Sequence, residues 1–127
     1  MLSAITREVK VSVETMYQGG TSPFHEQEHV FAYRISIMNL GDATVKLLRR
    51  HWYIVDSAVK RDVEGEGVVG QQPVLEPGES HVYISACNLS SEMGKMYGTY
   101  LFERVVDGEL FEVIIPEFKL IVPFRNN

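Results

Sequence analysis

Three glycines form the segment of the sequence whose spacing most resembles a ligand-binding motif. Gly65, Gly67 and Gly70 give the pattern G-x-G-x-x-G. In a dinucleotide-binding unit, such glycines allow a tight turn and bring backbone N–H groups close to a pyrophosphate at the start of a helix. Here Pro73 would break that helix, and three acidic residues between positions 62 and 66 would repel a phosphate. We therefore interpret the segment as a twisted strand or bulged loop, with a nucleotide site at these glycines as the alternative.

A second group of chemistry-bearing residues is the run Arg49-Arg50-His51-Trp52. Guanidinium groups beside an indole ring can form a cation–π arrangement or an anion-facing patch. Tryptophan and arginine also dominate the energetic centres of protein interfaces. A core tryptophan with flanking charges at a strand edge is the competing interpretation. Arg49, Arg50, His51 and Trp52 are thus candidates for an interaction surface.

The sequence also contains H-E-x-x-H, from His25 to His29. A metalloprotease carries this pattern on a helix, so that both imidazoles share one face and the glutamate acts as general base. A glycine- and proline-containing break precedes the motif and a strand is expected directly after it, which leaves little room for a helix. His51 and His81 fall on other predicted strands. We interpret the motif as a solvated loop, open to adventitious nickel or zinc, and predict neither a metal site nor a cofactor.

No nucleophile and base can be assigned as a pair. Ser80 and His81 are neighbours, and neighbours on a strand point to opposite faces. Cys87 is the single cysteine, and a packed thiol is a simpler interpretation than a nucleophile. The 17 carboxylates are scattered along the chain. An enzyme is therefore the least favoured of the function classes considered.

Alternating apolar and polar residues define the elements that must position these groups. This period of two marks a strand with one solvated face. In the longest candidate, residues 44–56, the alternation slips between Leu47 and Leu48, so we predict a β-bulge near Arg49-Arg50. Asp107-Gly108 lies between two β runs and predicts a hairpin. The predicted strands are residues 9–15, 30–37, 44–56, 59–70, 81–85, 97–106, 109–115 and 118–122.

These elements predict an all-β fold. About eight short strands, with no segment of ten or more residues at helical period, favour an antiparallel β-sandwich of the immunoglobulin or fibronectin type III kind, with a closed barrel second. The chain has 127 residues, of which 45% are hydrophobic and 23% charged. It fits a single domain over residues 1–127 that can fold without a metal or disulfide.

Charge and hydropathy limit the partners. A net charge of −5 repels the phosphate backbone, so we expect no nucleic-acid partner. No apolar run approaches the ~20 residues of a membrane helix, and the first residues do not read as a signal peptide. We expect no membrane insertion, and a lone cysteine fits a cytoplasmic location.

Five stretches carry a family resemblance that covers nearly the whole chain. They are residues 31–37 with Asn39 and Gly41, residues 47–52, residues 65–73, Leu75 with Pro77-Gly78, and Gly94 with Met96, Gly98 and Tyr100. In this order and spacing they resemble the ApaG family of small bacterial proteins. The resemblance implies a sandwich similar to immunoglobulin or fibronectin type III domains, and a genetic link to cobalt and magnesium handling. It also implies a gene beside that of a diadenosine tetraphosphate hydrolase, and a likeness to interaction domains of eukaryotic F-box proteins.

The resemblance carries over no catalytic residue, because none is established for the family. We therefore expect a non-enzymatic interaction module that binds a protein partner, and a homodimer stays open. The alternative is a small-ligand or metal-responsive protein that binds a nucleotide or dinucleotide near the glycine-rich segment.

Overall fold

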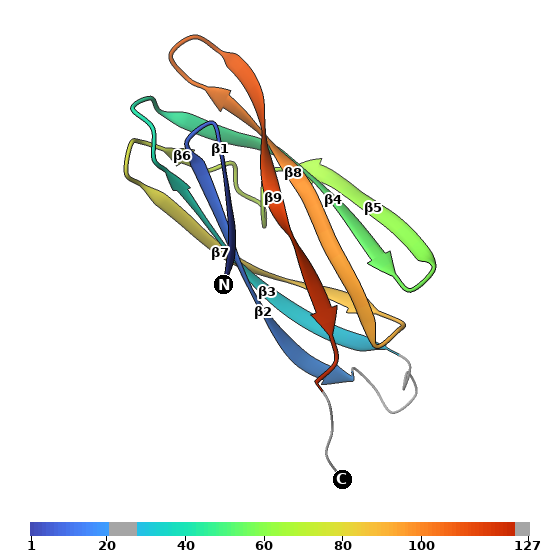
Figure 1. The fold of residues 1–127 in the computed structure, drawn as a ribbon. Coiled ribbons are helices and arrows are strands. Elements are labelled where there is room, and N and C mark those ends of the chain that lie inside the picture. The colour runs from blue at the N-terminus through green and yellow to red at the C-terminus, as the bar shows by residue number, and fades with distance from the viewer. Residues whose placement is uncertain (21–27, 124–127) are drawn as a thin grey trace.

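Two antiparallel β-sheets pack face to face in the structure, a computed structural model that describes residues 1–20 and 28–123 (Figure 1). Sheet A has the strand order β1-β2-β3-β7. Sheet B has the order β5-β4-β8-β9, and the short β6 also pairs with β4. The strands are β1 (Leu2–Thr6), β2 (Val9–Gly20), β3 (His29–Asn39), β4 (Val45–Asp56), β5 (Val59–Glu66), β6 (Val74–Leu75), β7 (Ser80–Leu89), β8 (Met93–Arg104) and β9 (Glu109–Ile121).

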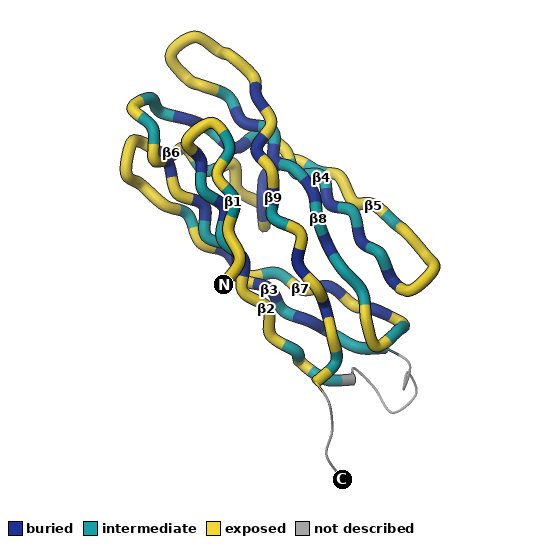
Figure 2. The backbone as a smooth tube through the Cα atoms, viewed as in Figure 1, coloured by how far each residue is buried: buried dark blue, intermediate teal, exposed yellow. Residues whose placement is uncertain are grey.

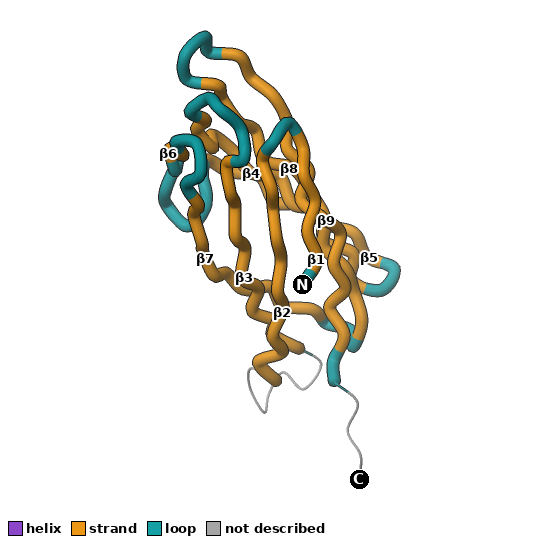
Figure 3. The backbone as a smooth tube through the Cα atoms, turned by 60° about the vertical axis from the view of Figure 1, so that its left-hand side comes forward, coloured by secondary structure: helices purple, strands orange, loops and turns teal. Residues whose placement is uncertain are grey.

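This architecture confirms the predicted antiparallel β-sandwich. The described residues form strands, turns and loops and contain no helix (Figure 3). Accordingly, residues 1–20 and 28–123 include no helix long and apolar enough to cross a membrane.

The strand count differs from the predicted eight for three reasons. The short strands β1 and β6 carry too few alternating residues to be recognised. The predicted strands 109–115 and 118–122 are one strand, β9, that continues through Pro116. Pro116 and Glu117 lie at a register shift opposite Tyr97, and a bulge accommodates a residue that has no N–H to donate.

The core lies between the sheets and follows the alternation of each strand (Figure 2). Val9, Val11 and Val13 of β2 face inward. On sheet B, Trp52 is 3% exposed and packs edge-on against Tyr100 and Phe118, at centroid distances of 6.4 and 5.8 Å. Trp52 is therefore a core residue, as the competing interpretation of its motif expected.

The slip in the alternation of β4 is a bulge. The β4–β8 register shifts between Leu47 and Arg49, close to the predicted position. The extra residue restores the pattern, so that Leu47 and Trp52 both face the core although their sequence separation is odd. As a consequence, Arg50 points into the molecule and Arg49 points out.

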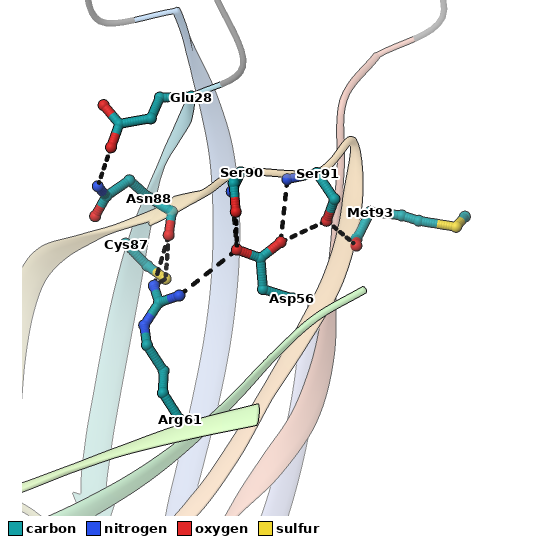
Figure 4. A network of polar contacts seen from close by, with 8 residues as sticks. All are labelled: Glu28, Asp56, Arg61, Cys87, Asn88, Ser90, Ser91 and Met93. Atoms are coloured by element: carbon teal, nitrogen blue, oxygen red, sulfur yellow. Dashed lines mark hydrogen bonds and ion pairs between the residues drawn. The ribbon is translucent and has the colours of Figure 1, made fainter. Parts of the chain in front are cut away.

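The two sheets are joined at both sides of the sandwich. On one side, the backbone N–H of Ile114 in β9 donates to Thr6 Oγ1 of β1 at 3.1 Å. On the other side, Arg61 of β5 donates from Nη2 to the Asn88 carbonyl of β7 at 2.6 Å. That second connection belongs to a polar cluster around Asp56 (Figure 4).

Asp56 is a buried carboxylate at the end of β4, 5% exposed. It accepts hydrogen bonds from the backbone N–H and hydroxyl groups of Ser90 and Ser91, at 2.5 to 3.1 Å. Arg61 Nη1 lies 3.6 Å from its Oδ2. Burial raises the pKa of Asp56, but the four hydrogen bonds outweigh burial and hold it below its ordinary value of 3.8.

This lowered pKa predicts a loss of stability in acid. The contribution of Asp56 is fully present above pH 3.8, its unfolded value, and is lost as the pH falls through the lower value of the folded state. The difference in unfolding free energy between the wild-type protein and Asp56→Asn should therefore shrink as the pH falls below about 4. Urea titrations at a series of pH values test this, and a difference that stays constant down to pH ~2 would contradict it.

Candidate functional site

A strip of stacked aromatic side chains lies on the outer face of sheet B. His51 and Tyr53 alternate with buried residues along β4 and point outward. Tyr53 pairs with Tyr97 of β8, and directly paired residues point to the same face. The Tyr53 and Tyr97 rings stack at 5.2 Å and 16°, and His51 stacks on Tyr53 at 4.4 Å and 23°. We call His51, Tyr53 and Tyr97, with the Lys60 described below, the tyrosine strip.

Two carboxylates of β5 hold the histidine end of the strip. Asp62 Oδ2 lies 3.0 Å from His51 Nε2, and Glu64 Oε1 lies 2.8 Å from Nδ1. Both contacts are hydrogen bonds when both ring nitrogens carry a proton, because a carboxylate only accepts. The pairing of His51 with Glu64 across β4 and β5 creates this arrangement. It fixes the ring plane against Tyr53.

Lys60 covers the other end of the strip. Its ammonium lies 5.2 Å from the ring centroid of Tyr53 and 5.6 Å from that of Tyr97, within cation–π range. A side-chain hydrogen bond to Tyr97 raises the pKa of Lys60 above its ordinary value. The strip is therefore a preformed surface in which each ring has a fixed neighbour.

The predicted interaction residues divide between two faces. Trp52 is in the core and Arg50 points inward, whereas Arg49 and His51 face solvent on sheet B. Arg49 and His51 line a shallow hollow of about 150 Å³, together with Glu64, Thr99, Leu101 and Glu112 and the edge of Arg50. This run thus contributes His51 to the tyrosine strip and Arg49 to its border.

The Arg50 side chain forms hydrogen bonds with the backbone of the glycine-rich segment. Its Nη1 donates to the carbonyl oxygens of Glu66 and Gly67 at 2.9 and 3.0 Å. Gly65 is the residue paired with Arg50 in β5, and a Cβ at Gly65 would lie 2.8 Å from the guanidinium nitrogens. Gly65 therefore leaves the space in which the arginine side chain crosses the strand.

Gly67 and Gly70 shape the turn that follows. Gly67 has φ +62°, and a Cβ there would lie 2.2 Å from the Gln71 carbonyl oxygen. Val69 and Gly70 have φ values of 47° and 76°, and Val68 and Gln71 exchange two backbone hydrogen bonds of 2.8 and 3.0 Å. Positive φ at both central residues is typical of a type I′ turn.

Three backbone N–H groups of this segment donate internal hydrogen bonds. The N–H of Gly67 donates to the Leu48 carbonyl at 2.8 Å, and those of Val68 and Gln71 donate within the turn. The freed Leu48 carbonyl at the bulge also accepts from Gln72 Nε2 at 2.9 Å. A pyrophosphate cradle needs outward-facing N–H groups, so this geometry supports a structural role for the three glycines.

Among residues 1–20 and 28–123, the other candidate residues form no catalytic arrangement. His25 lies outside the described residues, while His29 begins β3, with its Nδ1 3.1 Å from the Tyr17 hydroxyl. Cys87 is buried, which raises the pKa of its thiol. Residues 1–20 and 28–123 contain no group of three histidine, cysteine, aspartate or glutamate side chains that could hold a metal.

Sequence reasoning missed Tyr53, Tyr97 and Lys60. Each stands at an outward position in its own strand, which is a visible but weak signal. Their contact depends on the pairing of β4 with β5 and β8, and the β4–β8 register shifts at the bulge. A single sequence does not show that register.

The two packed antiparallel sheets define a small immunoglobulin-like β-sandwich protein. Residues 20–104 match the family model of the ApaG domain. A protein ApaG of Paramagnetospirillum magneticum is 44% identical over 127 residues, covering 99% of this chain and 97% of the relative. A protein ApaG of Brucella canis is also 44% identical, over 97% of this chain and 95% of the relative.

A solved structure agrees with these matches. The crystal structure of a putative ApaA protein from Bordetella pertussis superimposes with a TM-score of 0.83 at 42% identity, covering 91% of this chain and 94% of that one. The chain belongs to the ApaG family.

Proposed function

We propose that this protein is a non-enzymatic interaction module that binds a protein partner through the tyrosine strip. The single observation that supports this proposal is the stack of His51, Tyr53 and Tyr97 on the solvent-facing side of sheet B. Aromatic side chains supply large contact areas and are enriched at the energetic centres of interfaces.

The surroundings of the strip suit a partner of mixed charge. Lysines 60, 95 and 119 stand at one end of this face, while acidic side chains of β5 line the strip along its edge. The contacts with Asp62 and Glu64 and the stacking on Tyr53 restrict the motion of His51 before any partner binds. A preformed surface loses less side-chain entropy on association than a mobile one. Charges around an aromatic centre would set orientation and association rate more than affinity.

The family resemblance also provides a cellular setting for this proposal. We place the module in the cytoplasm and in cobalt and magnesium handling, because these are implied by the family resemblance. The likeness to interaction domains of F-box proteins supports a role in recognition.

We predict that Tyr53→Ser/Tyr97→Ser weakens partner binding at least tenfold. Loss of two stacked rings at the centre of an interface should cost about 1.4 kcal/mol or more. Partners captured from native lysate by the wild-type protein and identified by mass spectrometry would be purified, and their affinities for both proteins measured by calorimetry.

Val106→Ser is the matched control. Val106 is an apolar residue that is 77% exposed, but it lies in the turn after β8, away from the strip. This variant should bind like the wild-type protein. Equal affinities of the wild-type and double-serine proteins, at unchanged melting temperature, would refute the assignment of the strip.

A further inference from the structure

The outer face of sheet A carries a pattern that is complementary to itself. Cross-strand pairing places its outward residues in rows over β2, β3 and β7. The central row is Glu14-Arg34-Ile84, and the rows beside it are Ser12-Ser36-Val82 and Met16-Ala32-Ala86. β7 contributes no charged residue to this face. Figure 3 shows these three strands side by side.

The apolar members of this face are open to solvent. Ile84 is 58% exposed and Val82 is 44% exposed, and the Met16 side chain is also exposed. Met16 is paired with the small Ala32. Contiguous exposed apolar side chains on a folded domain mark interaction surfaces.

Glu14 and Arg34 occupy directly paired positions on the two central strands of sheet A. Among the described residues, neither side chain has a hydrogen bond or ion pair. Both charges are thus available in the central row, whose third member is the apolar Ile84.

We propose that a second copy of this chain docks on this face, so that the protein forms a symmetric dimer through sheet A. A two-fold axis parallel to the strands and above the midline of β2 and β3 would place β2 of one copy over β3 of the other. Glu14 would then face Arg34 of the second copy, and the ion pair would form twice, as symmetry requires. The same operation would place Met16 of one copy over the small Ala32 of the other, so that the methionine side chain fills space between the two faces.

The size of the face sets the expected affinity. Four strands about 4.8 Å apart and roughly nine residues long, at about 3.4 Å each, span about 600 Å² per copy. The axis places β7 of one copy over β1 of the other, which has only 5 residues, so the total is at most about 1,200 Å², the lower end of specific interfaces. We therefore expect a reversible dimer with a dissociation constant in the micromolar range.

A charge-exchange series tests this inference, which is independent of the partner proposed for the tyrosine strip. Sedimentation velocity from about 1 to about 500 µM should show a dimer for the wild-type protein. Glu14→Arg and Arg34→Glu should each weaken it at least tenfold, and the double variant should restore it. A mixture of the two single variants should form a heterodimer more tightly than either forms a homodimer, because both contacts between the copies become attractive.

The heterodimer separates contacts between copies from contacts within one chain. Each single variant places two like charges on its own sheet, so an effect within one chain would not be relieved by mixing. A monomer at all concentrations would overturn the proposal. A dimer whose affinity does not change with these charge substitutions would also overturn the proposal. Loss of partner binding by the tyrosine-strip variant does not bear on the dimer.

Discussion

Gly67→Ala should lower the unfolding free energy by about 3 kcal/mol or more. Two costs combine at this position. The backbone has φ +62°, which an L-residue adopts at a cost of about 1–2 kcal/mol, and the new Cβ would lie 2.2 Å from the Gln71 carbonyl oxygen. That oxygen belongs to the backbone of a closed turn, so the turn or the bonds that hold it must shift. Urea unfolding in the absence of any ligand measures the effect.

Gly70→Ala is the internal control. It has φ +76° but open space around a new Cβ, so we expect only the conformational cost of about 1–2 kcal/mol. Gly65→Ala should be intermediate, because the Cβ would displace the end of the flexible Arg50 side chain. Equal, small effects at Gly67 and Gly70 would contradict the structural role. Saturable binding of an adenine dinucleotide, lost in a normally folded Gly67→Ala protein, would favour the nucleotide alternative instead.

Asp56→Ala should destabilise the protein by about 3–4 kcal/mol. The substitution removes the acceptor for two backbone N–H groups and two hydroxyls of Ser90 and Ser91, as well as the ion-pair partner of Arg61. Hydrogen bonds to a charged group contribute about 1.5–3 kcal/mol each, and because Ser90 is exposed and Ser91 half-buried, water offsets part of the loss of these four bonds. Thermal and urea unfolding at pH 7 would measure the loss.

Asp107→Ala provides the comparison for this prediction. Asp107 also forms an ion pair with an arginine, Arg104, at 3.5 Å, but both side chains are about half exposed. Exposed ion pairs contribute about 0–1 kcal/mol. Similar losses for Asp56→Ala and Asp107→Ala would show that the Asp56 cluster does not hold the sheet ends together.

The sequence predicts the sandwich well because local alternation encodes which face of each strand is buried. The slip between Leu47 and Leu48 is visible as a break in that pattern, and the structure has a bulge there. The hairpin at Asp107-Gly108 was also predictable, although its loop covers residues 105–108 and only Gly108 has a positive φ. Turn chemistry thus located the reversal but not the loop length.

The glycine motif shows why site prediction was harder. Sequence reasoning expected positive φ or close approach at its glycines, and each glycine has its own reason in the structure. The reason for Gly65 is the side chain of Arg50, which points inward because of the bulge. Long-range pairing also creates the tyrosine strip, since Tyr53 and Tyr97 meet through the register of β4 with β8. Such contacts depend on register, which a single sequence leaves open.

Site-specific photo-crosslinking in cells tests the central claim most directly. A photoreactive residue would replace Thr99, which borders the tyrosine strip opposite His51, or Gln72, which is exposed beside the glycine-rich segment. Our account predicts a discrete crosslink to a different protein from position 99, lost in the Tyr53→Ser/Tyr97→Ser background, and none from position 72. A partner captured from position 72 but not from position 99 would contradict it.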